Sequence, residues 1–327
     1  MNKIKNSKVL VTGGAGFIGS NLIEVLLEQD NRVICLDNFM TGKRENIEAF
    51  FNNPDFVLLE GDIRDFLICR KACVGVDYVL HQAALGSVPR SIEDPMTSAE
   101  INIFGFVNIL FAAHEAKVKR FVYAASSSTY GDSEALPKYE DEIGKPLSPY
   151  AITKYVNELY AENFFRIYGI ESIGLRYFNV FGKYQDPDGD YAAVIPKFVS
   201  SMIKHESPVI NGDGSYSRDF TYIKNVVQAN QLAALAVEPK AVNTVYNIAY
   251  GERTTLNELY AELQKNLTRF DPKIANIHPH HGPERAGDIP HSLASIDKAR
   301  ELLGYDPQYN LDEGLQEATK WYFNNLK

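Results

Sequence analysis

Tyr150 and Lys154 have the residue types and the spacing that proton-transfer chemistry requires. The stretch from Tyr150 to Tyr168 is predicted to be helical, and residues four apart lie on one face of a helix. The pKa of a tyrosine in water is about 10, and a neighbouring positive charge favours the phenolate and lowers that pKa. Such a tyrosine can act as a general base near neutral pH. Because surface helices also carry such pairs, the spacing alone is a weak signal.

Ser126 makes this interpretation more specific because it follows a predicted strand, Phe121 to Ala124. A serine hydroxyl at a strand end can donate a hydrogen bond to a substrate oxygen and relay its proton. Ser148-Pro149 directly precedes Tyr150 and is typical of a helix start. The sequence therefore predicts acid–base catalysis where this strand and this helix meet.

A glycine-rich turn near the N-terminus indicates a ligand that carries phosphate. Gly13, Gly16 and Gly19 follow the apolar run Val9 to Val11 and precede a helical pattern of apolar residues, Ile18 to Leu27. Missing Cβ atoms let the backbone approach a pyrophosphate, and the helix N-terminus supplies free N–H groups. An ordinary tight turn is the alternative, but the strand–turn–helix context favours a dinucleotide site.

Asp37 indicates which dinucleotide this is. It ends the next apolar run, Arg32 to Leu36, about 20 residues after the glycines, where an acidic residue binds the adenosine ribose. A carboxylate there repels a 2′-phosphate, so NAD is favoured over NADP. The alternative, that Asp37 caps a turn with Asn38, explains the spacing less well.

The composition indicates a folded chain with a sizeable core. It has 327 residues, 45% of them hydrophobic, and a formal net charge of −9 with both signs interspersed. Its longest apolar runs are far short of a membrane span. The sequence has no basic cluster of the kind that indicates a nucleic-acid partner. The polar start, Met1 to Lys8, predicts that no signal peptide is present.

The cysteines and histidines predict a reducing, cytoplasmic compartment and no metal site. The three cysteines are an odd number, so no structural disulfide is expected. Cys35 falls in a predicted buried strand, and Cys69 and Cys73 fall on one helix face. The histidine cluster His278, His280 and His281 lies in a proline-rich stretch, for which we expect a solvated loop.

Alternating strands and helices in the first half predict a doubly wound parallel sheet of the Rossmann type. Right-handed crossovers place the loops after each strand at one edge, where ligands bind. The second half is less regular and predicts a smaller, discontinuous α/β lobe. Asn211 to Gly214 is interpreted as a hairpin turn, Val226 to Val237 as a helix, and Val245 to Ile248 as a strand that extends the sheet. Further strands are predicted at 56–60, 78–81 and 172–175, and further helices at 102–116, 256–267 and 296–303.

Several motifs together resemble the extended short-chain dehydrogenase/reductase family. They are Thr12 to Gly19, His81-Gln-Ala-Ala84, Ser126, and Tyr150-Ala-Ile-Thr-Lys154. Phe178-Asn-Val-Phe-Gly182 and Gly212 to Asp219 narrow the resemblance to the UDP-hexose 4-epimerases. The resemblance covers nearly the whole chain.

The resemblance implies an NAD-binding domain at 1–178 plus 217–250 and a nucleotide-sugar domain at 179–216 plus 251–327. It implies the catalytic residues Ser126, Tyr150 and Lys154. The implied cofactor residues are Gly13, Gly16, Phe17, Ile18, Asp37, Asn38, Gly42, Asp62, Ile63, Gln82, Ala83, Ala84, Tyr150, Lys154 and Tyr177. The implied substrate residues are Ser87, Ser126, Ser128, Tyr150, Asn179, Ala193, Val194, Arg218, Arg285, Asp288 and Ser292. Arg218 and Arg285 would neutralise the diphosphate.

Two departures from the wider family bear on the reaction. Members that remove water carry an Asp-Glu pair after the catalytic serine or threonine, whereas this chain continues Ser127-Ser128-Thr129. Ala193 and Ser292 are small where galactose-type epimerases often have asparagine and tyrosine, which leaves volume for an N-acetyl group. The serines at positions 87 and 128 also match the residue types of the subgroup that acts on N-acetylated sugars.

The expected function is therefore a 4-epimerase of UDP-N-acetylglucosamine and UDP-N-acetylgalactosamine, with UDP-glucose and UDP-galactose as further substrates. One alternative is the same reaction on a uronic-acid form, with Arg90 or a lysine pairing the carboxylate. A different-class alternative is a non-catalytic NAD-binding regulator on the same fold, against which the presence of all three catalytic residues argues. Family members pair two long helices each, so a homodimer is expected through 102–116 and 150–168. The apolar surface expected on the first of these comprises Phe104, Val107, Leu110 and Phe111, and the alternative is that they are buried against the sheet.

Overall fold

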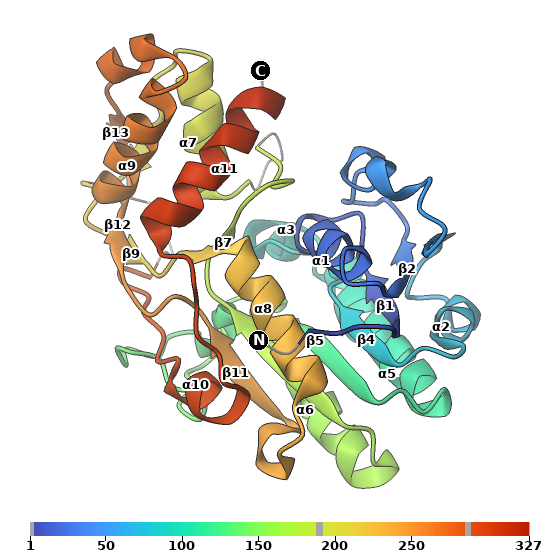
Figure 1. Cartoon of the computed structure of the whole chain (residues 1–327). Coiled ribbons are helices and arrows are strands. Elements are labelled where there is room, and N and C mark those ends of the chain that lie inside the picture. Colours follow the sequence, from blue (N-terminus) through green and yellow to red (C-terminus); the bar gives the residue numbers. More distant parts are fainter. Residues whose placement is uncertain (1–2, 188–191, 285–288, 327) are drawn as a thin grey trace.

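A computed structural model describes residues 3–187, 192–284 and 289–326. The chain folds around a seven-stranded sheet in the order β11-β6-β5-β4-β1-β2-β3, in which every neighbouring pair is parallel (Figure 1). The predicted doubly wound sheet is confirmed. Its strands are β1 (Lys8–Thr12), β2 (Arg32–Asp37), β3 (Phe56–Glu60), β4 (Tyr78–His81), β5 (Arg120–Ser126), β6 (Ser172–Tyr177) and β11 (Thr244–Ile248).

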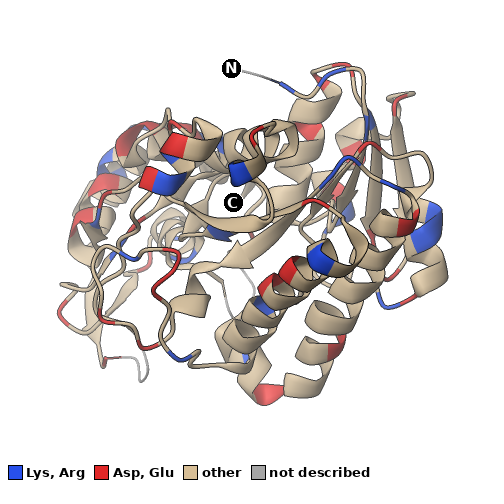
Figure 2. Cartoon of the chain, turned by 90° about the horizontal axis from the view of Figure 1, so that it is seen from below, with Lys and Arg blue, Asp and Glu red and all other residues tan. Residues whose placement is uncertain are grey.

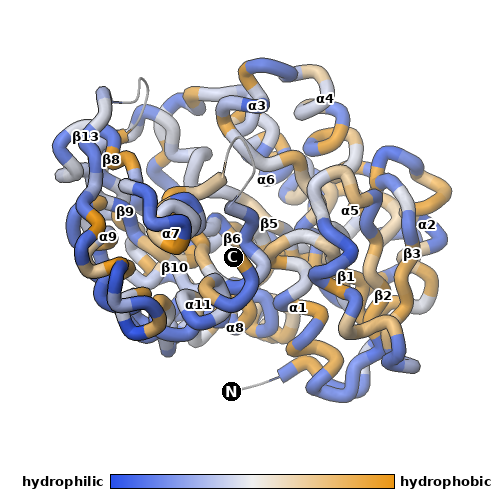
Figure 3. Tube along the Cα trace, turned by 90° about the horizontal axis from the view of Figure 1, so that it is seen from above, coloured by the Kyte–Doolittle hydropathy of each residue, from blue (hydrophilic) through white to orange (hydrophobic). Residues whose placement is uncertain are grey.

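Both faces of the sheet are buried, which is why its strands are continuous apolar runs. Val9 and Val11 of β1 belong to one core cluster and Leu10 to the other. The helices α1 (Phe17–Leu27) and α8 (Ile223–Leu235) cover the first face, and α2 (Phe66–Cys73), α5 (Phe106–Glu115) and α6 (Pro149–Tyr168) cover the second. Figure 3 shows hydrophobic segments along the strands of this sheet. Cys35, Cys69 and Cys73 are free thiols buried in these two clusters, as expected.

One helix passes a membrane-span test by length and composition, contrary to our expectation that the apolar runs are too short. It runs from Pro95 to Glu115, over α4 (Pro95–Ala99), a π-helical segment (Glu100–Gly105) and α5. Half of its most apolar window is buried inside the protein. Phe106 and Ile109 are fully buried in the cluster on the second face of the sheet. Among the described residues this is the one such helix, and its packing is that of a core helix.

The second lobe is assembled from discontinuous pieces, as predicted. The helices α7 (Val194–Ile203), α9 (Leu256–Thr268) and α11 (Leu311–Asn325) pack on one another. Its strands pair as β7 (Val180–Phe181) with β10 (Thr221–Tyr222), β9 (Ser217–Arg218) with β12 (Thr254–Thr255), and β8 (Val209–Asn211) with β13 (His280–Gly282). One core cluster continues from β1 into these helices. The remaining helices are α3 (Val88–Glu93) and α10 (Asp297–Leu303), with short 3₁₀ turns at Arg44–Asn46, Glu48–Phe50, Ser127–Tyr130, Pro239–Ala241 and Pro272–Asn276.

The hairpin predicted at Asn211 to Gly214 is wrong. The turn forms, but β8 before it pairs parallel with β13, and β9 after it pairs antiparallel with β12. The local glycines fix the turn, while the partners come from segments far along the chain. The same pairing corrects the loop expected for the histidines, because His280 and His281 lie in β13, where both are exposed. Figure 2 shows acidic and basic residues interspersed along the helices.

Candidate active site

The turn after β1 forms a cradle that a side chain would fill. Gly13 has a φ of +67°, and its N–H donates to the Leu36 carbonyl oxygen (2.8 Å). A Cβ on Gly13 would lie 2.7 Å from backbone atoms of Ala83, and one on Gly19 would lie 2.2 Å from the Gly13 oxygen. Helix α1 begins directly after Gly16 without a side-chain cap. Its first N–H groups are therefore available to a phosphate.

This cradle opens into a cavity of about 410 Å³ at the carboxyl edge of the sheet. The cavity crosses the point where the strand order reverses, between β1 and β4, which is where ligands bind in open α/β sheets. Every residue that the sequence assigns to the cofactor lines it: Gly13, Gly16, Phe17, Ile18, Asp37, Asn38, Gly42, Asp62, Ile63, Gln82, Ala83, Ala84, Tyr150, Lys154 and Tyr177. The residues present thus fit an extended dinucleotide.

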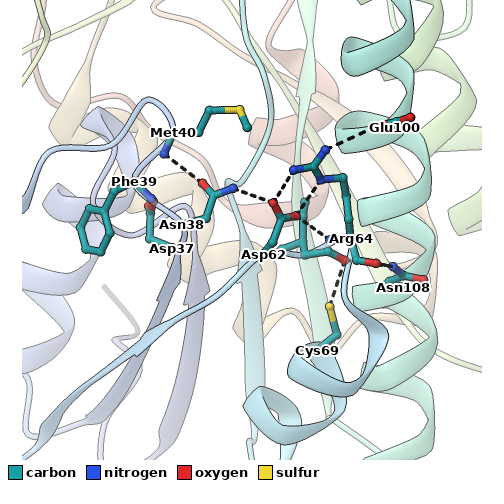
Figure 4. A network of polar contacts seen from close by, with 10 residues as sticks. Asp37, Asn38, Phe39, Met40, Asp62, Arg64, Cys69, Glu100 and Asn108 are labelled. Carbon is teal, nitrogen blue, oxygen red and sulfur yellow. Dashed lines mark hydrogen bonds and ion pairs between the residues drawn. The ribbon is translucent and has the colours of Figure 1, made fainter.

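Acidic groups at the far end of the cavity are held by hydrogen bonds within the protein. Asp37 accepts hydrogen bonds from the Ala15 N–H (2.9 Å) and the Phe39 N–H (2.8 Å), and burial raises its pKa. Asp62 accepts from Asn38 Nδ2 (2.8 Å) and from the Arg64 guanidinium (2.7 Å) (Figure 4). The Arg64 bonds lower the pKa of Asp62 to about 2, so this carboxylate is ionised across the physiological range.

The three predicted catalytic residues line the other end of the same cavity. Ser148 caps α6 by accepting from the Ala151 N–H (3.1 Å), as the helix-start signal predicts, and this sets Tyr150 in the first turn. The Lys154 ammonium donates to the Ala124 carbonyl oxygen (2.9 Å) and lies 5.9 Å from the centre of the Tyr150 ring. The Ser128 hydroxyl donates to the Ser126 oxygen (2.9 Å), which leaves the Ser126 proton free to point toward Tyr150 or a ligand.

Burial corrects the expected pKa of the tyrosine. Desolvation raises the pKa of Tyr150, and its hydrogen bond with Ser126 opposes this only in part. Burial also lowers the pKa of Lys154 to about 8, because an ammonium is as poorly solvated there as a phenolate. The protein's own groups therefore do not lower the Tyr150 pKa, and the lowering that we expect beside Lys154 also requires the positive charge of a nicotinamide. A further positive charge beside the ring is needed to favour the phenolate.

The sequence interpretation missed Asn102, which joins the loop after β4 to the catalytic helix. Its side chain accepts from the Leu85 N–H (2.7 Å) and donates to the Leu85 carbonyl oxygen (3.1 Å) and to Thr153 Oγ1 (3.1 Å). Thr153 in turn donates to the Tyr150 carbonyl oxygen (2.8 Å). The π-helical segment that carries Asn102 is a feature often found at functional sites. A buried asparagine between Ile101 and Ile103 is the signal that could have revealed it.

Asn230 was also missed. It lies on α8 and donates from Nδ2 to the Tyr177 hydroxyl oxygen (2.9 Å), while Gln82 Nε2 donates to its Oδ1 (3.2 Å). The Tyr177 hydroxyl donates to Gln82 Oε1 (3.1 Å). These three residues close a ring of hydrogen bonds that fixes two cavity-lining side chains.

The residues assigned to the substrate are only partly brought together. Ser126, Tyr150 and Asn179 line the cavity, and Ser128 contacts Ser126. Ser87 instead caps α3, accepting from the Arg90 N–H (3.2 Å).

Four of the other assigned substrate residues, Ala193, Val194, Arg218 and Ser292, lie in the second lobe and do not line the cavity. Ala193 and Val194 begin α7. Arg218 donates to the carbonyl oxygens of Ser217 and Pro290, and the Ser292 N–H donates to the same Ser217 oxygen (3.1 Å). Arg285 and Asp288 lie outside the described residues.

Comparison with known proteins identifies the family. The family model for the NAD dependent epimerase/dehydratase family matches residues 9–249. A putative UDP-glucose 4-epimerase of Methanocaldococcus jannaschii is 39% identical over 319 residues, which are 97% of this chain and 99% of that protein.

Two solved structures are similar over nearly their whole length. A UDP-N-acetylglucosamine 4-epimerase of Methanobrevibacter ruminantium, in complex with UDP-N-acetylmuramic acid, has a TM-score of 0.92 and 38% identity, covering 98% of this chain and 99% of that one. A UDP-glucuronic acid 4-epimerase of Bacillus cereus, with UDP-glucuronic acid and NAD, has a TM-score of 0.86 and 30% identity, covering 97% and 99%. The chain therefore belongs to the NAD-dependent epimerase/dehydratase family, as an enzyme that uses NAD and is similar to the UDP-sugar 4-epimerases within it.

Proposed function

We propose that this enzyme is a 4-epimerase that interconverts UDP-N-acetylglucosamine and UDP-N-acetylgalactosamine, with UDP-glucose and UDP-galactose as further substrates. The observation that carries the reaction type is the meeting of Ser126, Tyr150 and Lys154 in one cavity with the glycine cradle. A regulator that only binds NAD has no need for these three side chains together. The similarity to the UDP-N-acetylglucosamine 4-epimerase supports the choice of substrate.

The chain's own residues handle the proton and the orientation of the sugar. The glycine cradle and Asp37 would hold NAD, which would supply a hydride acceptor and donor at sugar carbon 4. Tyr150 accepts the proton of the 4-hydroxyl, and the Ser126 hydroxyl donates to the same sugar oxygen. Lys154, buried and bonded to the Ala124 oxygen, holds its positive charge 5.9 Å from the centre of the Tyr150 ring. The 4-keto sugar turns about its phosphate linkage, and Tyr150 then gives the proton back.

A dehydratase mechanism lacks its acid–base pair in this chain. The residues after Ser126 form a 3₁₀ turn, Ser127–Tyr130, that contains no carboxylate. Elimination across carbons 5 and 6 needs a proton donor and a base at that place. We therefore propose that the 4-keto sugar is reduced again rather than dehydrated.

A second candidate is the corresponding UDP-uronic acid, either UDP-glucuronic acid or an N-acetylated uronate. The similarity to the UDP-glucuronic acid 4-epimerase favours it, and Arg90 is the proposed partner of a 6-carboxylate. The test is an assay of the purified enzyme with UDP-N-acetylglucosamine, UDP-glucose and their uronates, with the epimeric products separated by chromatography. Turnover of the N-acetylated sugar with the highest kcat/KM is expected. Turnover of a uronate alone would replace the first candidate with the second.

Ser292 provides a test of the acetamido pocket. We predict that Ser292→Tyr removes activity on N-acetylated sugars by steric exclusion while activity on UDP-glucose survives. Overfilling a packed pocket costs on the order of 1–3 kcal/mol, which is enough to reverse a modest preference in kcat/KM. Ser292 is half-buried and hydrogen-bonded beside Arg218 rather than in the cofactor cavity. Unchanged kcat/KM on both sugars would remove Ser292 from the sugar pocket.

Asp37 provides a test of cofactor choice. We predict that the wild-type enzyme copurifies with NAD and that Asp37→Ser loses discrimination against NADP, because the carboxylate no longer repels the 2′-phosphate. Serine can still accept a hydrogen bond from the Ala15 or Phe39 N–H, which limits damage to the turn. Mass analysis of the nucleotide released on denaturation, and titration with both dinucleotides, measure this. Wild-type enzyme that carries NADP would contradict the prediction.

We also propose a homodimer that pairs the two long helices of each chain. The structure corrects the surface expected for it, since Leu110 is fully buried and Val107 and Phe111 pack against the core. Phe104 stays 68% exposed, and Met96 is 71% exposed nearby on the same helix. We predict that light scattering gives twice the 36.7 kDa of one chain and that Phe104→Glu shifts the enzyme toward a monomer. A wild-type monomer at micromolar concentration would refute the dimer.

A further inference from the structure

A buried ion pair fixes the catalytic helix to the sheet at a point that the proposed mechanism does not use. Glu158 lies on α6 one turn after Lys154, and Arg176 lies on β6. Arg176 donates from Nε to Glu158 Oε1 (2.9 Å) and from its terminal nitrogen to Oε2 (2.7 Å). The two side chains are 3% and 8% exposed. This bidentate geometry constrains both the position of α6 along β6 and the rotation of α6 about its own axis.

The same guanidinium reaches the turn that carries Ser126. It stacks on the Tyr130 ring at 4.9 Å from the ring centre, and Tyr130 ends the 3₁₀ turn that starts directly after Ser126. Its remaining nitrogen donates to the Glu140 carbonyl oxygen (2.8 Å). The Tyr130 hydroxyl donates to Asn247 Oδ1 (2.6 Å), at the end of the neighbouring strand β11.

Asn247 continues the network into the segment that leads to the second lobe. Its Nδ2 donates to the carbonyl oxygens of Lys138 (2.9 Å) and Ser295 (3.0 Å), and Asn247 is fully buried. The backbone of Lys138 also forms a bridge with Ala294, since the Lys138 N–H donates to the Leu293 oxygen (2.8 Å) and the Ser295 N–H to the Lys138 oxygen (3.0 Å). Leu293 directly follows Ser292, the residue assigned to the sugar pocket.

General stability is a poor explanation for this network. Replacing a buried ion pair with apolar side chains of similar volume is often neutral or stabilising. The directional hydrogen bonds of this network instead fix the relative position of the parts that they join. Here those parts are the helix with Tyr150 and Lys154, the turn after Ser126, and the segment 293–295 that follows Ser292.

We propose that Arg176, Tyr130 and Asn247 form a buried hub of positioning residues. This hub fixes the catalytic helix relative to the proposed sugar-binding segment around Ser292 while the 4-keto sugar rotates. This rests on the proposed epimerase function. Epimerisation needs two transfers with one ketone retained between them: the carbon 4 electron pair leaves with its hydrogen, and the same pair must return. If the two parts drift, the ketone escapes and the cofactor stays reduced. The hub therefore sets the ratio of epimer formed to ketone lost.

The test compares two tyrosine variants that remove one buried hydroxyl each. Tyr130→Phe breaks the bond to Asn247 inside the hub. Tyr246→Phe is the matched control, because Tyr246 is also fully buried, is next to Asn247 in β11, and donates to the Ala241 oxygen (2.8 Å) outside the hub. The purified NAD-loaded enzymes are given UDP-N-acetylglucosamine. Reduced cofactor is followed by its near-ultraviolet absorbance, released ketone by trapping, and stability by urea unfolding.

We expect Tyr130→Phe to raise reduced cofactor and released ketone per epimer formed by about tenfold, the change that the loss of one buried hydrogen bond supports. Tyr246→Phe should lose similar stability with an unchanged ratio. Arg176→Lys, which keeps the charge and loses the fork, should raise the ratio further. Equal ratios in Tyr130→Phe and the control, with a normal wild-type enzyme, would overturn the hub. A wild-type enzyme that does not epimerise any of the sugars would instead overturn the proposed function.

Discussion

Tyr150→Phe should lower kcat by about 10²–10⁴-fold, the range that a positioned general base contributes, while NAD stays bound. The substitution removes one oxygen and keeps the ring of a half-buried side chain, so the shape of the cavity is kept. The remaining cavity-lining groups, including Lys154 and the glycine cradle, are unchanged. NAD content is measured on the denatured protein, and turnover is measured with the best substrate of the panel.

The pH profile adds a second measurement to this variant. Burial raises the Tyr150 pKa, so at neutral pH the phenol is the main form unless a positive charge offsets the desolvation. Wild-type kcat/KM should therefore rise with pH as the base ionises, and this limb should vanish in Tyr150→Phe. Tyr155→Phe is the control, because Tyr155 is on the same helix and does not line the cavity. Turnover near the wild-type value in Tyr150→Phe would exclude Tyr150 as the base.

The parts of the fold that could be predicted from the sequence are those in which local pattern and burial agree. The inner strands β1, β2, β4, β5 and β6 are largely buried, so each appears as an apolar run with turn residues at its carboxyl end. The i, i+4 spacing likewise puts Tyr150 and Lys154 on one face of α6, and both line the cavity. The position of Asp37 after β2 follows from the same regularity, because a parallel sheet brings all its strand ends to one edge.

The parts that could not be predicted depend on partners far away in the chain. Nothing near Asn211 says that its strand pairs with His280 to Gly282, so the turn was interpreted as a hairpin. The raised pKa of Tyr150 comes from desolvation in the assembled cavity, which no local sequence pattern reports. The hub around Arg176 joins segments from β6, α6 and β11, and each of its residues alone resembles an ordinary polar residue. Helix α11 was overlooked although Asn310 and Glu313 form a capping box at its start.

Gly13→Ala should remove NAD from the purified enzyme. At a φ of +67°, an alanine is strained by roughly 1–2 kcal/mol. Its Cβ would also lie 2.7 Å from the Ala83 N and Cα atoms, which belong to backbone and cannot move away as a flexible side chain would. The turn or the Ala83 loop must shift, and both line the cavity. We expect the affinity for NAD to fall by at least about tenfold, since each 1.4 kcal/mol of lost binding gives that factor.

Gly169→Ala separates this steric effect from backbone strain. Gly169 ends α6 with a φ of +72°, and a Cβ there would meet no heavy atom within 4 Å. Gly169→Ala should lose about as much unfolding free energy as backbone strain alone costs Gly13→Ala. It should keep its NAD, because Gly169 has open surroundings and does not line the cavity. Isothermal titration of nucleotide-stripped protein gives the two affinities, and urea unfolding gives the two stabilities. If Gly13→Ala bound NAD as tightly as Gly169→Ala, the close approach of Gly13 to Ala83 could not be what shapes the cofactor cradle.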